Sequence, residues 1–324
     1  MKKEILIMLL CFSSNLLISQ SVKFGKITKE ELQEKVHPLD STAEAAYLFK
    51  YRKTYFKYSQ DDGFKIITDI HEKIKIYNRS GFEKATQNIK YYKPDSGGKQ
   101  KVTGIKAYTY NLEQGKVNKE KLNSKDIFDE KINKYWSSKK ITMPNVKEGS
   151  IVELKYKITS PYFQISEVEF QKDIPIKKLE YSVTMPEYFK YKQNAKGYYF
   201  VSPKSSKKRE SIKFSSRVRT NDPYTHQSGV SYSNVDYNSD LSEYEATNIP
   251  ALTDREPYVS SINNYRGGIT FELTSIQYPN FRPKYYATTW DDVVKTIYKP
   301  TSFGDELKRK GYFENDLKAL LATA

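Results

Sequence analysis

Cysteine is almost absent from this sequence, which restricts the chemistry that the protein can perform. The only cysteine among 324 residues is Cys11, and it lies in a segment with the features of a secretory signal peptide. Two lysines precede an apolar run over residues 5–18, and polar residues follow, so we expect cleavage next to Gln20. A mature chain without a thiol has no disulfides and no cysteine nucleophile.

The same N-terminal segment has two other interpretations. As a transmembrane helix it is too short, and Ser13, Ser14 and Asn15 interrupt it. A lipid anchor on Cys11 calls for a small preceding residue, where Leu10 stands, and this anchor is kept as an alternative. We therefore expect an exported protein, periplasmic or associated with the cell surface, that is not an integral membrane protein.

Histidine is scarce as well, and the phosphate-binding and nucleophile motifs are incomplete. His37, His71 and His226 show no paired spacing typical of a zinc site, and His71 falls on the charged side of an alternating stretch, where a solvated imidazole is expected. "SGGKQ" has Gln100 where a phosphate loop has Ser or Thr, and "GVSYS" ends on Ser233 where a nucleophile elbow has glycine. We predict no metal and no cofactor.

Lysine and tyrosine are abundant instead. The formal net charge is +15, and the chain contains 28 Tyr and 16 Phe. Such a composition is compatible with nucleic-acid binding, because lysine neutralises phosphate and tyrosine stacks on bases, but export argues against that partner. Anionic envelope glycans or peptides are the remaining polyanionic partners. The simpler interpretation is that lysines on the wetted faces of sheets keep the protein soluble.

Alternation of apolar and charged residues dominates from about residue 50 to residue 273. Successive side chains of a strand point to opposite faces, so this pattern predicts antiparallel sheets with one apolar and one wetted face. Two such sheets bury their apolar sides against each other, which predicts a mainly β protein built as a large antiparallel β-sandwich. The apolar positions are Ile66, Ile70, Ile74, Ile76, Val152, Leu154, Tyr156, Ile158, Leu179, Tyr181, Val183, Met185, Ile269, Phe271 and Leu273.

Helical signals are confined to a few places. Asp40 or Ser41 before "AEAAYLF" predicts one short helix, and residues 124–132 predict a helical turn. Thr289 is expected to cap a helix over "WDDVVKTIY", which has two aspartates in its first turn. The final residues carry Leu317, Leu320 and Leu321 at helical spacing. Residues 303–313, FGDELKRKGYF, continue in the same helical style.

Near residues 279–283 the strand-like alternation ends and the helical spacing begins, and this change defines the predicted domains. Residues 1–20 are a signal peptide, 21–278 the β-sandwich and 284–324 a short helical segment. Forty residues are too few to hold a core alone, so this segment is expected to belong to a larger unit.

The closest approach to a catalytic acid pair is Glu167 with Glu169, which share one face of a strand at i, i+2. Glycosidase carboxylates normally come from separate elements, so the pair is weak evidence. Enzymatic activity based on acid or serine chemistry is kept as an alternative.

Three stretches together are similar to the domain of unknown function 3857 family, found in exported bacterial proteins, notably of Bacteroidetes. The resemblance spans roughly residues 40 to 275. In that family a transglutaminase-like domain with a papain-type Cys-His-Asp triad typically follows, so the resemblance implies that residues 284–324 begin such a domain, truncated here. No triad residue can be carried over, and no catalytic residue is assigned. The stretches are residues 71–85, 143–163 with 170–191, and 248–275.

The resulting hypothesis is a non-catalytic exported β-sandwich that precedes and positions a transglutaminase-like domain beyond this chain. Glu256 and Arg266 flank a turn near the boundary, and Tyr258 and Tyr265 are expected to cover the helix that carries Trp290. A surface ion pair worth under about 1 kcal/mol is the alternative for Glu256 and Arg266. The alternative function is an envelope carbohydrate- or peptidoglycan-binding module, which would need exposed aromatic platforms.

Overall fold

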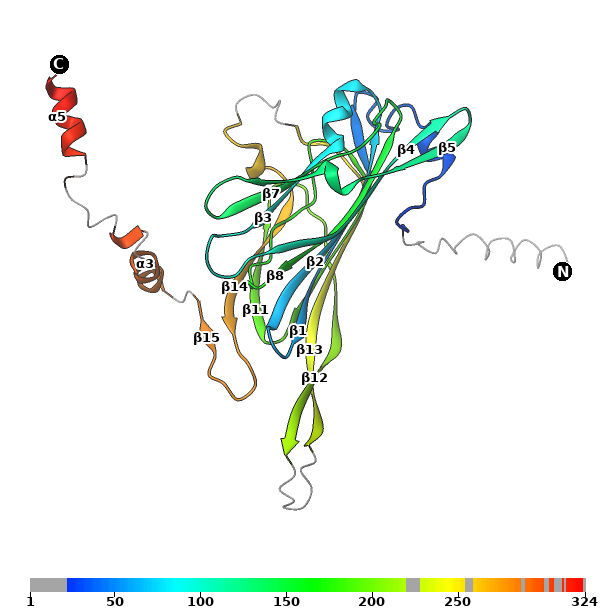
Figure 1. Ribbon diagram of the computed structural model, residues 1–324. Coiled ribbons are helices and arrows are strands. Elements are labelled where there is room, and N and C mark those ends of the chain that lie inside the picture. Colours follow the sequence, from blue (N-terminus) through cyan, green and yellow to red (C-terminus); the bar gives the residue numbers. More distant parts are fainter. Residues whose placement is uncertain are drawn as a thin grey trace, which may run out of the picture.

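A large twisted sheet forms the centre of the molecule (Figure 1). The computed structural model describes residues 22–219, 228–253, 259–286, 289–299, 303–305, 311 and 313–322. Within these residues the large sheet has eight strands, and neighbours are antiparallel except for one parallel pair, β1 with β10. Their spatial order is β12 (Lys204–Arg219), β13 (Ser228–Ile249), β10 (Ile176–Pro186), β1 (Ala45–Ser59), β2 (Gly63–Ile76), β8 (Ile151–Ser160), β4 (Lys101–Glu113) and β5 (Lys116–Lys121).

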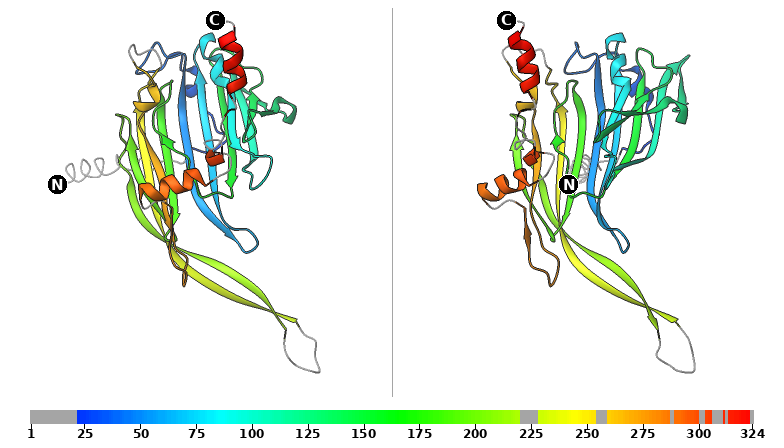
Figure 2. Two further views of the ribbon diagram at one scale, coloured as in Figure 1. Left: turned by 90° about the vertical axis from the view of Figure 1, so that its left-hand side faces the viewer. Right: turned by 60° about the vertical axis from the view of Figure 1, so that its left-hand side comes forward.

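Two smaller sheets share one continuous hydrophobic core with the large sheet. This arrangement confirms the predicted mainly β sandwich. The strands β12 and β13 extend beyond the rest of the sheets as a long hairpin (Figure 2). One small sheet contains β11 (Phe189–Lys196), β14 (Gly268–Ile276), β15 (Lys284–Tyr285) and β9 (Val168–Glu169), and the other contains β3 (Thr86–Tyr92), β7 (Trp136–Thr142) and β6 (Ile127–Lys131).

Aromatic rings join the large sheet to the sheet of β11. Phe189 of β11 has its ring centroid 4.6 Å from that of Phe56 and 4.6 Å from that of Phe163, and it also meets Phe64 edge-on. Such pairs add about 0.5–1.5 kcal/mol each beyond the burial of their surface. Some of the many Phe and Tyr side chains therefore pack between the two layers and hold them together.

Helices are short and peripheral, and none in the described parts of the chain is long and apolar enough to span a membrane. The predicted cap is confirmed, because the hydroxyl of Thr289 accepts a hydrogen bond from the backbone of Asp292 at 3.2 Å. The helices are α2 (Lys29–Gln33), α3 (Trp290–Tyr298) and α5 (Glu314–Ala322), with 3-10 turns η2 (Arg79–Ala85), η3 (Ser124–Asp126) and η4 (Ile262–Asn264).

One helical prediction needs correction. The helix expected after Asp40 is wrong, because Ala45 already begins β1, which pairs with β2 on one side and β10 on the other. Pairing on both sides overrides the local helix propensity of an alanine-rich stretch. The helical turn predicted within residues 124–132 is confirmed as η3, and β6 follows directly from Ile127.

The outer face of the large sheet is covered at one end by the N-terminal strap, which we define as residues 22–34 (Figure 1). The expected solvated His71 is therefore wrong: only 9% of this residue is exposed, and Lys75 and Glu153 on the same face are fully buried. Leu32 of the strap packs with Leu48, Tyr110 and Ile151 in a second, smaller core. At this end of the sheet the charged face is therefore covered by the strap.

Candidate functional site

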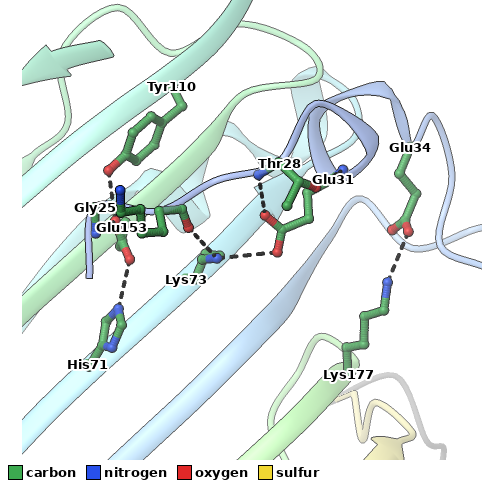
Figure 3. A network of polar contacts seen from close by, with 10 residues as sticks. Gly25, Thr28, Glu31, Glu34, His71, Lys73, Tyr110, Glu153 and Lys177 are labelled. Carbon is green, nitrogen blue, oxygen red and sulfur yellow. Dashed lines mark hydrogen bonds and ion pairs between the residues drawn. The ribbon is translucent and has the colours of Figure 1, made fainter. Parts of the chain in front are cut away.

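The strap is shaped locally by a capping box at the start of α2 (Figure 3). The hydroxyl of Thr28 accepts from the backbone N–H of Glu31 at 3.2 Å, and the carboxylate of Glu31 accepts from the backbone N–H of Thr28 at 3.0 Å. Thr or Ser followed three residues later by Glu is a helix-start signature. This signal could have predicted α2 from the sequence.

Glu153 is the centre of the polar contacts beneath the strap (Figure 3). One carboxylate oxygen lies 2.8 Å from Nε2 of His71, and the other accepts from the hydroxyl of Tyr110 at 2.8 Å and from the backbone N–H of Gly25 at 2.9 Å. Burial and this hydrogen bond raise the pKa of Tyr110 far above its usual value. A buried carboxylate with three partners is well satisfied, which favours a structural role.

Two buried lysines hold the backbone of the strap. Nζ of Lys73 donates to the carbonyl of Lys26 at 3.1 Å, and Nζ of Lys75 donates to the carbonyls of Leu32 and Gly149, both at 2.7 Å. Burial lowers the pKa of Lys75 to about 8. This end of the sheet therefore holds the strap, including its helix α2, through backbone carbonyls as well as side chains.

A second polar cluster lies on the inner face of the sheet, around a cavity of about 140 Å³. Lys50 forms an ion pair with Glu72, and both side chains are nearly buried. The guanidinium of Arg52 donates to the carbonyls of Glu167 and Ser166 at 2.6 and 2.8 Å. Buried charges of this kind are retained where geometry and partners are favourable, and such clusters are candidates for functional sites.

The predicted acid pair belongs to this cavity. Glu167 and Glu169 both line it, although only Glu169 lies in a strand, β9, so the predicted shared strand face is not formed. Each is held by its own cation, Lys196 and Lys172. Burial alone would raise the pKa of Glu169, whereas Lys172 and then Arg266 hold it below its usual value. Two carboxylates that each contact a separate cation do not form an acid and base pair.

The predicted contact residues lie in different surroundings. The ring of Tyr265 stacks on Tyr198 at 5.6 Å, and Arg266 donates to Asn263 at 3.1 Å while its charge acts on Glu169 in the cavity. Trp290 on α3 is 84% exposed. No recorded contact among the described residues joins Tyr265 or Arg266 to Trp290.

Glu256 and Tyr258, the other two predicted contact residues, lie outside the described residues. Among the residues that are described, no cluster of three His, Cys, Asp or Glu side chains could hold a metal ion. The cavity cluster was missed at the sequence level because Lys50, Arg52 and Glu72 occupy inward-facing positions of strands that are otherwise apolar.

The fold defines an exclusively β-cored domain in which one large sheet is covered by two smaller ones and by a strap. Residues 66–219, from β2 to β12, match the family model DUF3857, described as "Domain of Unknown Function with solved-structure structure". The match over these residues confirms the resemblance drawn from the sequence.

Comparison with individual proteins adds little. No curated protein matches the chain. Among solved structures, the crystal structure of a "putative protease" from Parabacteroides distasonis matches with a TM-score of 0.49 and 13% identity, covering 70% of this chain and 40% of that one. The chain thus spans about 40% of that protein's length, and a likeness at this level carries no argument about activity.

Proposed function

We propose that this protein is a non-catalytic, exported β-sandwich that precedes and positions a transglutaminase-like domain with a Cys-His-Asp triad. The family match over residues 66–219 supports the assignment, because the resemblance implies such a domain after the sandwich. In this proposal residues 284–324 are the first part of that domain, and the signal-peptide-like segment directs export.

One observation carries the positioning role: α3 has an apolar face and no buried residue. Trp290, Val294 and Ile297 recur at i, i+4 and i+7, and they are 84%, 47% and 46% exposed. Figure 1 shows α3 and α5 apart from the three sheets. An amphipathic helix in a folded protein normally buries such a stripe.

The free energy available from covering this stripe is considerable. Burying one large apolar side chain stabilises by about 1.5–3 kcal/mol, so three of them supply enough to fix the orientation of a neighbouring domain. The described sandwich already closes over its own core, so the partner surface is assigned to the transglutaminase-like domain. The inner cavity contributes no catalysis in this proposal, because its carboxylates are held by cations.

Tryptophan fluorescence tests this proposal, because the chain has only two tryptophans. In a Trp136→Phe background, we expect the emission of Trp290 to shift to shorter wavelength when the coding sequence downstream of Ala324 is included, and that sequence to encode a Cys-His-Asp domain. Trp290→Phe is the matched control and should abolish the signal. A stop codon directly after Ala324, or unchanged emission in the longer polypeptide, would refute the positioning role.

A further inference from the structure

A groove of about 560 Å³ lies on the outer face of the large sheet, formed by β1, β10, β13 and β12. Tyr51 and Tyr55, four residues apart on β1, lie along it and are half-buried. Side chains of both charges surround these rings. The rings and the charged side chains that converge on this groove offer contacts for a ligand.

The groove is continuous with the surface that already holds the N-terminal strap. Tyr51 is the cross-strand partner of His71, so both side chains are on the same face. Ring contacts run from Phe24 of the strap to His71 at 5.4 Å, from His71 to Phe49 at 5.3 Å, and from Phe49 to Tyr51 at 6.1 Å. The strap thus covers one end of this face, and the groove lies at its open end.

Negative charge gathers at the end of the groove next to the strap. Tyr51 pairs with Glu180, which pairs with Glu245, and Glu243 is two residues farther along β13 on the same face. Glu180 and Glu245 also meet Lys178 and Lys204, at 2.6 and 3.3 Å. The pair of Lys204 with Glu245 is exposed and therefore weak, and Glu243 makes no recorded ion pair within the described residues. Glu243 and Glu245 can therefore accept a cationic ligand group.

Positive charge gathers at the opposite end. Lys57 is six residues after Tyr51 on β1, which corresponds to about 20 Å at about 3.3 Å per residue. Lys208 lines the same end and contacts Glu210 at 3.0 Å. The groove therefore runs from carboxylates at one end, past Tyr51, Lys53 and Tyr55, to Lys57, Lys208 and Glu210 at the other end. This line is as long as about six extended residues.

We propose that this groove binds an extended peptide of about six residues with an ammonium group at one end and a carboxylate at the other. The ammonium group lies beside Glu243 and Glu245, the carboxylate beside Lys57 and Lys208, and an apolar side chain in between packs on Tyr51 and Tyr55. The strap shows how the same face holds a polypeptide, with lysines donating to carbonyls and a carboxylate accepting from an N–H. This inference goes beyond the positioning role and does not depend on it.

Calorimetric titration of the purified protein with two hexapeptides, both blocked at the termini, tests the inference. The amphoteric probe is Lys-Gly-Phe-Gly-Gly-Asp, and the neutral probe is Ser-Gly-Phe-Gly-Gly-Ser. We expect the neutral probe to bind about tenfold more weakly. The double variant Glu243→Gln, Glu245→Gln and the single variant Lys57→Met should each weaken binding of the amphoteric probe, the double variant by about fivefold.

Lys116→Met is the matched control, since this lysine is exposed on β5 outside the groove, and it should leave the affinity unchanged. Equal affinity for the two peptides, or no effect of the groove variants, would overturn the inference. Binding of chitohexaose in place of the peptide would overturn it as well and assign the groove to glycans. Because every residue tested lies in the sandwich, these results are separate from the presence of a transglutaminase-like domain.

Discussion

Glu153 and His71 are separated by 82 positions in the sequence, and their side chains meet at 2.8 Å beneath the N-terminal strap. The pair lies on neighbouring strands, and Gly25 of the strap donates to the same carboxylate. One buried side chain therefore links three segments of the chain. This relationship makes the strap a part of the folded domain.

Replacing Glu153 by alanine is expected to destabilise the protein strongly. The change leaves Tyr110 and the N–H of Gly25 without their acceptor inside a closed interface, which costs about 3 kcal/mol or more. Urea unfolding followed by circular dichroism measures the loss. Glu120→Ala on the exposed strand β5 is the control and should change the free energy of unfolding by less than about 0.5 kcal/mol. Equal midpoints for the two variants would contradict the central role of Glu153.

Lys75 is expected to make stability depend on pH in the alkaline range. Burial lowers the pKa of Lys75 to about 8 in the folded protein, whereas an unfolded chain has about 10.4. Between these values the unfolded state binds more protons, so stability rises with pH through this window and is lost as pH falls towards 8. Lys75→Met removes this contribution.

The measurement is the free energy of unfolding at several pH values from neutral to about 10, for the wild type and Lys75→Met. The difference, wild type minus variant, should increase with pH. Lys116→Met, at an exposed position, serves as the control and should give a constant difference. If the difference for Lys75→Met also stays constant with pH, folding does not lower the pKa of Lys75.

Phe189→Ala is expected to separate the two layers of the sandwich. Phe189 is 2% exposed and contacts the rings of Phe56, Phe163 and Phe64, so truncation leaves a cavity and should cost about 3–5 kcal/mol. Phe128→Ala on β6 is a suitable comparison, because 59% of Phe128 is exposed and the change should be small. Similar denaturation midpoints for both variants would be inconsistent with a core held by these rings.

The apolar faces of the strands could be predicted from the sequence because alternation is a local property. Ile66, Ile74 and Leu154 are buried on the inner face as their spacing predicts. The covered part of the outer face could not be predicted in the same way. His71 and Lys73 alternate with apolar residues as exposed positions do, and only the packing of a strap some forty residues earlier in the chain buries them.

The wrong prediction of a helix after Asp40 and the failure to predict the inner cavity have related causes. Local propensity favoured a helix near Ala45, but strand pairing on both sides decided the structure. The inward-facing Lys50 and Glu72 interrupt the apolar pattern of their strands, and their mutual contact depends on a register that no short-range signal specifies.

A double-mutant cycle on Lys50 and Glu72 should show strong coupling at the inner cavity. Lys50→Met alone leaves the Glu72 carboxylate without its cation in a nearly buried position, and Glu72→Leu alone leaves the ammonium group, so each should destabilise by about 3 kcal/mol. Replacing both removes two charges together and should restore most of the loss, because buried ion pairs exchange for apolar residues at little net cost. Urea unfolding of the four proteins measures the coupling. Additive losses would show instead that Arg52 or Lys172 compensates the Glu72 carboxylate and that water solvates the Lys50 ammonium group, each independently of the pair.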